Sequence, residues 1–578
     1  MTDRVRPGVI ATKAVNQYRR RDAFAYLGLR QLLKGVVARS DDWANQIAVD
    51  QVIRRSTPSY FVSEHFKERD AGGRDVFRKI VVPGPLEILA EVSLLTACAG
   101  LRELEPHESV FTYRLSNPSD RSGVYKNYMD GLRARHRAIE MACSSSPNSV
   151  VRFLDLKKFY PSIRSKDIKA AWRKHAGGLS AIHKLLGERL IDDHGRNSVD
   201  GSRGLLTGPM FSHFMANLVM RDVDEWASKE LGVHYFRYVD DIALVGERSG
   251  VASATSKLAE RLKTLDLTLH DEHSAKTMEV DALTWLDGKS DFEHDFGNLT
   301  WGRFISDIKS FLTLNPDKSQ RLASALADAG ARLPVLDYSI AVKEARHAES
   351  FYGRARRAFF RATTAALTVE SIADAGRRLR AKMESELQPM LDQLPATTGF
   401  ARKRLIPKLR FRIGRLAYLS EESVLESFAD AASGVEELVL QREVIRATAT
   451  GDLSQIVAMG ANAMQAAAQP LTAGAQNVSL TADALTSVEL QAIAVAALNG
   501  VTISGKNAVI SDDGILDLSR GVRIKELKKS AQSFISEVAF LAGTEGGHGS
   551  LLSDAFDEDE RLTFDAVERF EESAPRVI

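Results

Sequence analysis

Two adjacent aspartates between two apolar stretches constrain the fold of this chain more than any other feature of its sequence. Asp240 and Asp241 separate residues 236–239 (FRYV) from residues 242–245 (IALV). Short apolar stretches on both sides of a polar pair predict two strands joined by a tight turn. Two neighbouring carboxylates repel each other, which destabilises the fold unless a cation neutralises them. An acid pair alone is most often a polar turn, so it indicates a site only together with further acids.

A third acid, Asp155, accompanies the pair. Asp155 ends another apolar stretch, residues 150–156 (VVRFLDL). Carboxylates on neighbouring strands can hold two divalent cations about 4 Å apart, an arrangement that promotes phosphoryl transfer from a nucleotide. Mg²⁺ binds few protein carboxylates and keeps phosphate oxygens among its ligands. We therefore expect Asp155, Asp240 and Asp241 to be catalytic residues and ligands of Mg²⁺ or Mn²⁺.

The composition indicates a soluble globular chain of several domains. It has 578 residues, of which 44% are hydrophobic and 26% are charged, values that exclude a disordered or membrane protein. The first residues lack the apolar core of a secretory signal. Two cysteines, Cys98 and Cys143, are too few for a zinc site and suit a reducing compartment. We expect a cytoplasmic protein with no membrane partner.

The net charge of +1 hides an uneven distribution along the chain. Residues 301–420 hold roughly two basic residues for each acidic one, whereas residues 553–578 are acidic. Such a basic region can follow a phosphate backbone, or it can be a solvated basic face of helices. The basic residues that support the first interpretation are Arg354, Arg356, Arg357, Arg402, Lys403, Arg404, Lys408, Arg410 and Arg412.

The pattern changes along the chain from mixed to helical. The mixed part is expected to hold a strand at 78–83 followed by a helix at 85–101, a helix ending near residue 142, a strand at 150–156, and a loop running into a helix at 203–227. After about residue 300 the pattern is helical, apart from a small hairpin expected within residues 500–518.

Several segments, taken in order, resemble the motifs of the reverse transcriptase family. They are residues 78–83 and 111–114 for the fingers, 153–163 for the first palm motif, 204–218 for the loop and helix that support the templating pair, 238–241 (YVDD) for the YxDD box, 267–277 for the motif after it, and 283–288 for the primer-grip turn. The resemblance implies an α+β polymerase palm and fingers of the right-hand type, followed by a large all-α, repeat-like helical domain. The expected domains are residues 1–145 (N-terminal segment and fingers), 146–295 (palm) and 296–578 (helical, with the acidic tail).

The resemblance also implies roles for individual residues. Asp155 and Asp240 would bind both metals, with Asp241 as a supporting ligand. Arg78 and Arg114 would bind the triphosphate of the incoming dNTP, because a guanidinium contacts phosphate bidentately; the alternative is a surface ion pair for each. Lys276 would donate a proton to the pyrophosphate.

Sugar and base selection would rest on two further places. Tyr160, five positions after Asp155, stands where reverse transcriptases exclude a 2′-hydroxyl, which favours dNTPs over NTPs; the alternative is a core aromatic. Thr207 and Gly208 stand where many members carry Gln-Gly, and Leu206 replaces a common proline. Threonine is shorter than glutamine, so contacts with the template or the incoming base would differ.

The long helical extension resembles that of bacterial abortive-infection and phage-defence reverse transcriptases. This resemblance implies homo-oligomers, an RNA template or a bound RNA, a DNA product, and synthesis that in some members needs no template. Three alternatives stay open. They are a retron-like or mobile-element enzyme that copies a partner RNA, a catalytically idle nucleic-acid-binding protein, and an RNA polymerase, which Tyr160 disfavours.

Overall fold

A computed structural model gives the structure of this protein. It describes residues 7–19, 21–70, 72–197, 204–274, 276–287, 300–333, 335–336, 338–339, 342–343, 367–473, 478–479, 485–501, 503–504, 514–519 and 533–542. The acidic tail, Arg354, Arg356 and Arg357 lie outside these residues.

An antiparallel sheet with the strand order β4-β5-β3-β6 forms the palm. Its strands are β3 (Val150–Asp155), β4 (His234–Tyr238), β5 (Asp241–Gly246) and β6 (Met278–Asp281). Successive side chains of β3 and β5 enter two different hydrophobic cores, one on each face of the sheet. Both faces are therefore covered, which explains why these strands are almost continuously apolar. The strands predicted around Asp155 and around the acid pair are confirmed.

A long hairpin, β1 (Tyr60–Arg69) with β2 (Asp75–Pro83), forms the fingers. Helix α5 (Pro85–Cys98) follows directly, with proline in its first turn, where the missing N–H costs no hydrogen bond. The strand and helix predicted for this stretch are confirmed. Before the hairpin, the described residues form the α-helices α1 (Val9–Tyr18), α2 (Ala23–Lys34), α3 (Asp41–Trp43) and α4 (Val49–Arg54).

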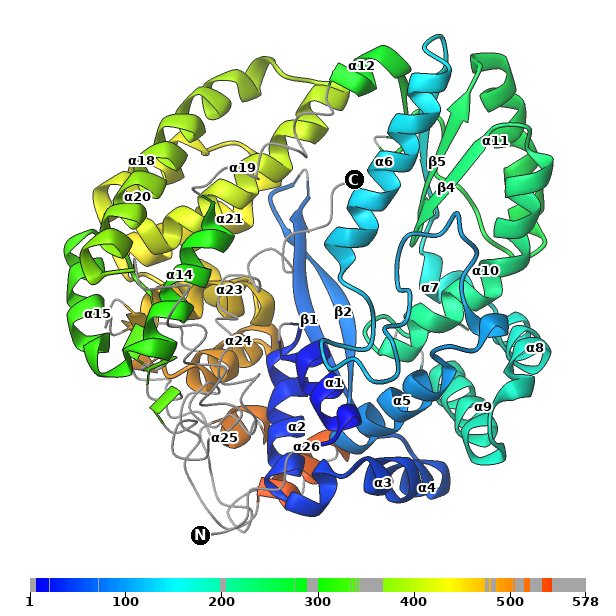
Figure 1. Cartoon of the computed structure of the whole chain (residues 1–578), viewed down its shortest axis with the longest axis horizontal. Coiled ribbons are helices and arrows are strands. Elements are labelled where there is room, and N and C mark those ends of the chain that lie inside the picture. The colour runs from blue at the N-terminus through cyan, green and yellow to red at the C-terminus, as the bar shows by residue number, and fades with distance from the viewer. Residues whose placement is uncertain are drawn as a thin grey trace.

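Helices surround the palm sheet. Helix α6 (Tyr128–Ser145) packs on β4 and β5, and α11 (Arg248–Lys263) packs on β5 (Figure 1). The loop and helix predicted at 203–227 are found as a loop leading into α10 (Met210–Glu230). The remaining helices are α7 (Phe159–Ser162), α8 (Ser165–His175), α9 (Ala181–Arg196) and α12 (Ala282–Asp287). The predicted primer-grip turn is thus helical up to Asp287, and Gly288 lies outside the described residues.

The helical region divides between two hydrophobic cores. One core holds α14 (Trp301–Leu314), α15 (Ser319–Asp328), α18 (Val369–Gln393), α19 (Gly399–Leu419), α20 (Glu422–Ala431) and part of α21 (Val439–Thr450). The later helices α22 (Ser454–Ala458), α23 (Ala461–Ala473), α24 (Ser487–Leu498), α25 (Gly514–Ser519) and α26 (Ser533–Ala542) share a core with the fingers and part of the palm. Figure 1 shows the fingers hairpin between the palm on one side and helices α23 and α24 on the other.

The hairpin predicted within residues 500–518 is wrong where the structure describes that stretch. β8 (Ile503–Ser504) pairs in parallel with β7 (Val478–Ser479), and Gly514–Ser519 is helix α25. Leu516 and Leu518 are buried, so packing against neighbouring helices replaces the expected strand pairing.

The outer edge of β1 is covered by amide side chains from the helical region. Asn462 accepts a hydrogen bond from the Phe66 N–H at 2.8 Å and donates to the Phe66 carbonyl at 3.0 Å. Gln491 accepts from the Glu64 N–H at 3.0 Å and donates to the Val62 carbonyl at 3.1 Å. These four bonds satisfy backbone groups that an exposed edge strand would leave to another chain.

Two further observations bear on the sequence predictions. Cys98 and Cys143 are both free and buried. Within the described ranges, no helix combines the length and the apolarity that are needed to span a bilayer.

Candidate active site

Three aspartates meet at one end of the palm sheet. Asp155 ends β3 and lies directly opposite Asp241, the first residue of β5. The Leu156 N–H donates to the Asp240 carbonyl at 3.1 Å, which ties the turn to the end of β3. Val239 has a φ of 59°, a left-handed conformation that is uncommon for a β-branched residue. Backbone pairing and a strained turn therefore bring together the acids that the sequence predicts.

These carboxylates carry more negative charge than their surroundings neutralise. Burial, together with the charge of Asp155, raises the pKa of Asp240. Burial, with the charge of Asp240, raises the pKa of Asp241 to about 8. Such shifts mark a cluster of like charges that a cation would relieve, and hard carboxylate oxygens suit Mg²⁺. Among the described residues, no three or more His, Cys, Asp or Glu side chains already stand close enough together to hold a metal ion.

Basic side chains approach the cluster from several elements. Lys276 lies with its Nζ 3.2 Å from Oδ2 of Asp155. The charge of the exposed Arg78, on the fingers strand β2, acts to lower the pKa of Asp240. Arg135 of α6 is buried, with its guanidinium 6.0 Å from the Phe153 ring, and its charge acts to lower the pKa of Asp241. The site thus gathers cations around a set of carboxylates, as binding of a polyanionic substrate with its metals requires.

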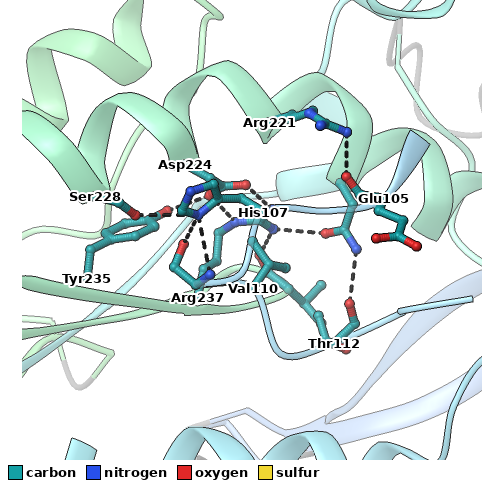
Figure 2. A network of polar contacts seen from close by, with 12 residues as sticks. Glu105, His107, Val110, Thr112, Arg221, Asp224, Ser228, Tyr235 and Arg237 are labelled. Carbon is teal, nitrogen blue, oxygen red and sulfur yellow. Dashed lines mark hydrogen bonds and ion pairs between the residues drawn. The ribbon is translucent and has the colours of Figure 1, made fainter. Parts of the chain in front are cut away.

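A buried ion pair joins Arg237 of β4 to Asp224 of α10 (Figure 2). Arg237 and Asp224 are both 0% exposed, and the guanidinium donates through Nε at 2.7 Å and through Nη2 at 2.6 Å. Tyr235 also donates to Asp224, at 2.8 Å. Arg237 Nη1 donates to the Val239 carbonyl at 2.9 Å and to Asn217 Oδ1 at 3.1 Å. Arg237 therefore holds the strained residue that precedes the acid pair.

The loop before α10 joins the palm to the fingers. The Thr207 carbonyl accepts from the Val81 N–H at 2.7 Å, and the Tyr160 carbonyl accepts from the Leu205 N–H at 3.0 Å. Gly208 has a φ of +131°, and a Cβ there would lie 2.1 Å from the Val81 carbonyl oxygen. Only glycine allows this approach. Thr207, Gly208 and Tyr160 are thus brought together beside the fingers strand that carries Arg78.

Arg114 lies apart from this set. Its guanidinium donates to the backbone carbonyls of Val110 at 2.8 Å and of His107 at 2.7 Å. Burial lowers its pKa. In this conformation Arg114 shapes the loop before it, and its predicted contact with a triphosphate stays a prediction.

Helix α19 brings part of the basic helical region to the palm. Phe400 stacks on Phe153 with the ring centroids 6.5 Å apart. Burial lowers the pKa of Lys403, and the charges of Asp241 and Asp155 act to raise it, so Lys403 lies within electrostatic reach of the aspartates. Arg402 instead forms an ion pair with Glu437 at 2.6 Å. The basic stretch is therefore divided between residues that hold helices together and residues that face the palm.

Further basic residues of α19 act within the helical region. Arg412 pairs with Glu386 at 2.7 Å. Arg410 donates to the Glu437 carbonyl at 2.7 Å. These two arginines therefore stabilise the helical region, Arg412 through an ion pair and Arg410 through a hydrogen bond.

The antiparallel palm sheet carries acids at one end, a fingers hairpin lies beside it and basic side chains surround it, an arrangement that fits the palm and fingers of a nucleic-acid polymerase. Residues 99–288 match the family model described as reverse transcriptase (RNA-dependent DNA polymerase). The match covers the three aspartates, Tyr160 and Lys276, and it supports a reverse-transcriptase-like polymerase with palm and fingers. A search of curated proteins finds no match.

Sequence reasoning missed the buried residues around the site, namely Arg237, Arg135 and His213. Arg237 stands inside an apolar strand, and a charge in such a place could have indicated a buried partner. Arg135 and His213 lie on helices whose patterns give no sign that these side chains point towards the site.

Proposed function

We propose that this chain is a DNA polymerase that joins dNTPs by two-metal-ion phosphoryl transfer, directed by RNA or working without a template. The observation that carries the proposal is the cluster of Asp155, Asp240 and Asp241 with raised pKa values for two of them. In the proposal these acids hold two Mg²⁺ ions, and Mn²⁺ can replace them. Held by these acids, the metals would supply activation of the attacking 3′-hydroxyl and stabilisation of the leaving pyrophosphate.

The residues around the acids would contact the bound nucleotide. Arg78 would contact the triphosphate, and Lys276 would protonate the pyrophosphate. Tyr160 would pack against the sugar and exclude a 2′-hydroxyl, with Thr207 and Gly208 beside the base. Supporting this assignment, Lys276 contacts Asp155 and the loop that carries Gly208 contacts the fingers strand.

The biological setting proposed is phage defence by a cytoplasmic homo-oligomer. Its support is the extent of the helical region and the resemblance of that region to extensions in defence reverse transcriptases. Bound RNA and the DNA product would be its nucleic-acid partners. Sequencing nucleic acid that copurifies with the protein separates this proposal from a retron-like enzyme, which would retain one defined RNA.

The chemistry is tested by changing the acid pair. Asp240→Asn with Asp241→Asn should reduce dNTP incorporation by on the order of 10³-fold or more, because losing metal ligands removes several kcal/mol of transition-state stabilisation. Asp271→Asn is the matched control, since Asp271 is 80% exposed and pairs with Lys157. Incorporation in the double variant at the rate of the control would refute the metal assignment. Absence of incorporation by the unaltered protein would instead favour an idle nucleic-acid-binding protein.

A further inference from the structure

One buried histidine connects Tyr160 with the N-terminal segment of the chain. His213 lies in the first turn of α10 and is 3% exposed. Tyr160 Oη lies 2.5 Å from Nδ1 of His213. On the other side of the ring, Nη2 of Arg21 lies 2.6 Å from Nε2. Both ring nitrogens are therefore in hydrogen-bond contact, each with a different element.

Arg21 determines which ring nitrogen of His213 carries the proton. A guanidinium only donates hydrogen bonds, so Nε2 must be the acceptor and carries no hydrogen. The remaining proton of the neutral ring is then on Nδ1, which donates to the Tyr160 hydroxyl oxygen. The contact with Arg21 thus sets the direction of the hydrogen bond that reaches Tyr160.

Aromatic rings hold His213 in place. Tyr113 stacks on it with the ring centroids 3.9 Å apart and the planes 6° from parallel. Tyr125 meets it edge-on at 6.4 Å and donates its own hydroxyl to the Met210 carbonyl at 2.7 Å. Tyr160 packs edge-on against it at 5.2 Å. The imidazole cannot rotate without displacing these rings, so it is a fixed support for Tyr160.

We infer that His213, with its tautomer set by Arg21, is a positioning residue for sugar selection. This inference rests on the proposed function, in which Tyr160 excludes a 2′-hydroxyl. A ring excludes one oxygen atom only if it cannot tilt away, and the hydrogen bond from Nδ1 opposes that tilt. Arg21, which lies between α1 and α2, thereby gives the N-terminal segment a part in choosing between dNTP and rNTP.

Two variants of similar size separate the two ring nitrogens. In His213→Asn the side-chain amide takes the place of Nδ1 and can still donate to Tyr160, whereas in His213→Gln it takes the place of Nε2 and can contact only Arg21. The measurement is the ratio of kcat/KM for dNTP to kcat/KM for rNTP, with Tyr160→Ala as the reference. We expect His213→Asn to keep the ratio near that of the unaltered protein. His213→Gln should lower it roughly three- to tenfold, the effect of one hydrogen bond.

Arg21→Met tests the same idea while leaving the His213 ring and its packing in place. Without the guanidinium the proton can move to Nε2, so the ratio should fall about two- to fivefold. Melting curves of all variants identify any that fail to fold, and Arg21→Met then carries the test alone.

The outcomes distinguish this inference from the proposed function. Equal effects of His213→Asn and His213→Gln, or an unchanged ratio in Arg21→Met, would overturn the inference if Tyr160→Ala still lowers the ratio. An unchanged ratio in Tyr160→Ala would instead refute the role of Tyr160 in sugar selection. A smaller ratio in His213→Gln and Arg21→Met, but not in His213→Asn, supports the positioning role.

Discussion

The buried pair of Arg237 and Asp224 offers a test of how the acid turn is held. In Arg237→Met, the Asp224 carboxylate keeps only the hydrogen bond from Tyr235, in a place that is 0% exposed. Leaving such a charge without its partner costs roughly 3–5 kcal/mol. We therefore expect the melting temperature to fall by on the order of 10 °C.

A second variant separates stability from geometry. Asp224→Leu, Tyr235→Phe and Arg237→Met together remove the charges and the phenol, and apolar replacement of a buried pair is often neutral. This triple variant should regain most of the melting temperature. It still lacks the donor to the Val239 carbonyl, so the left-handed residue, a conformation that costs about 1–3 kcal/mol, is no longer held.

The assay compares thermal melting with dNTP incorporation on the same preparations. The triple variant should melt close to the unaltered protein and yet incorporate dNTPs at least about tenfold more slowly, because misplacing the metal ligands weakens transition-state stabilisation. Activity that recovers together with stability would refute the reasoning, since Arg237 would then serve only the fold. A triple variant that melts as low as Arg237→Met would show that the buried pair stabilises the palm by itself.

Two further predictions concern other parts of the molecule. Burial raises the pKa of Glu91 to about 8, so the folded state holds a proton that the unfolded state loses above its pKa of 4.5. The Glu91 carboxyl should therefore make the free energy of unfolding fall as pH rises from about 4.5 to 8, contributing at most ~1.4 kcal/mol per pH unit. Urea unfolding of Glu91→Gln should show a smaller fall over this range than the unaltered protein, and parallel pH profiles would contradict the assignment. Lys403→Glu should weaken nucleic-acid retention and reduce its salt dependence by about one ion. Arg402→Glu should instead lower the melting temperature, because it breaks the pair with Glu437. Weaker retention in Arg402→Glu together with a lower melting temperature in Lys403→Glu would show that Arg402 guides nucleic acid.

The sequence predicted the parts of the fold that depend on local pattern. The strands at Asp155 and at Asp240 follow from apolar stretches that are buried on both faces, and α5 follows from Pro85 and the apolar residues after it. Nothing local, however, shows that Gly514–Ser519 is helical. The segment packs against α24 and α26, and such contacts between separate helices leave no periodicity in a short segment.

The same limit applies to the candidate site. The acids could be predicted because a motif places them next to each other or at the end of a strand. The residues that support Tyr160 could not be predicted, because Arg21 and His213 are far apart in sequence and meet only in the folded chain. Arg114 shows the opposite case, in which a residue belongs to a motif but its guanidinium contacts backbone carbonyls in this structure.

Because amide side chains of the helical region cover the edge of β1, the fingers, the palm and the helical region are connected to one another in a ring. The helical region is attached to the fingers through Asn462 and Gln491 and to the palm through Phe400. A change in the angle between fingers and palm must therefore deform or shift the helices between these attachments. Under the proposed function, a ligand that prefers one arrangement of those helices would change the affinity for nucleotide, and nucleotide would change the affinity for that ligand by the same factor.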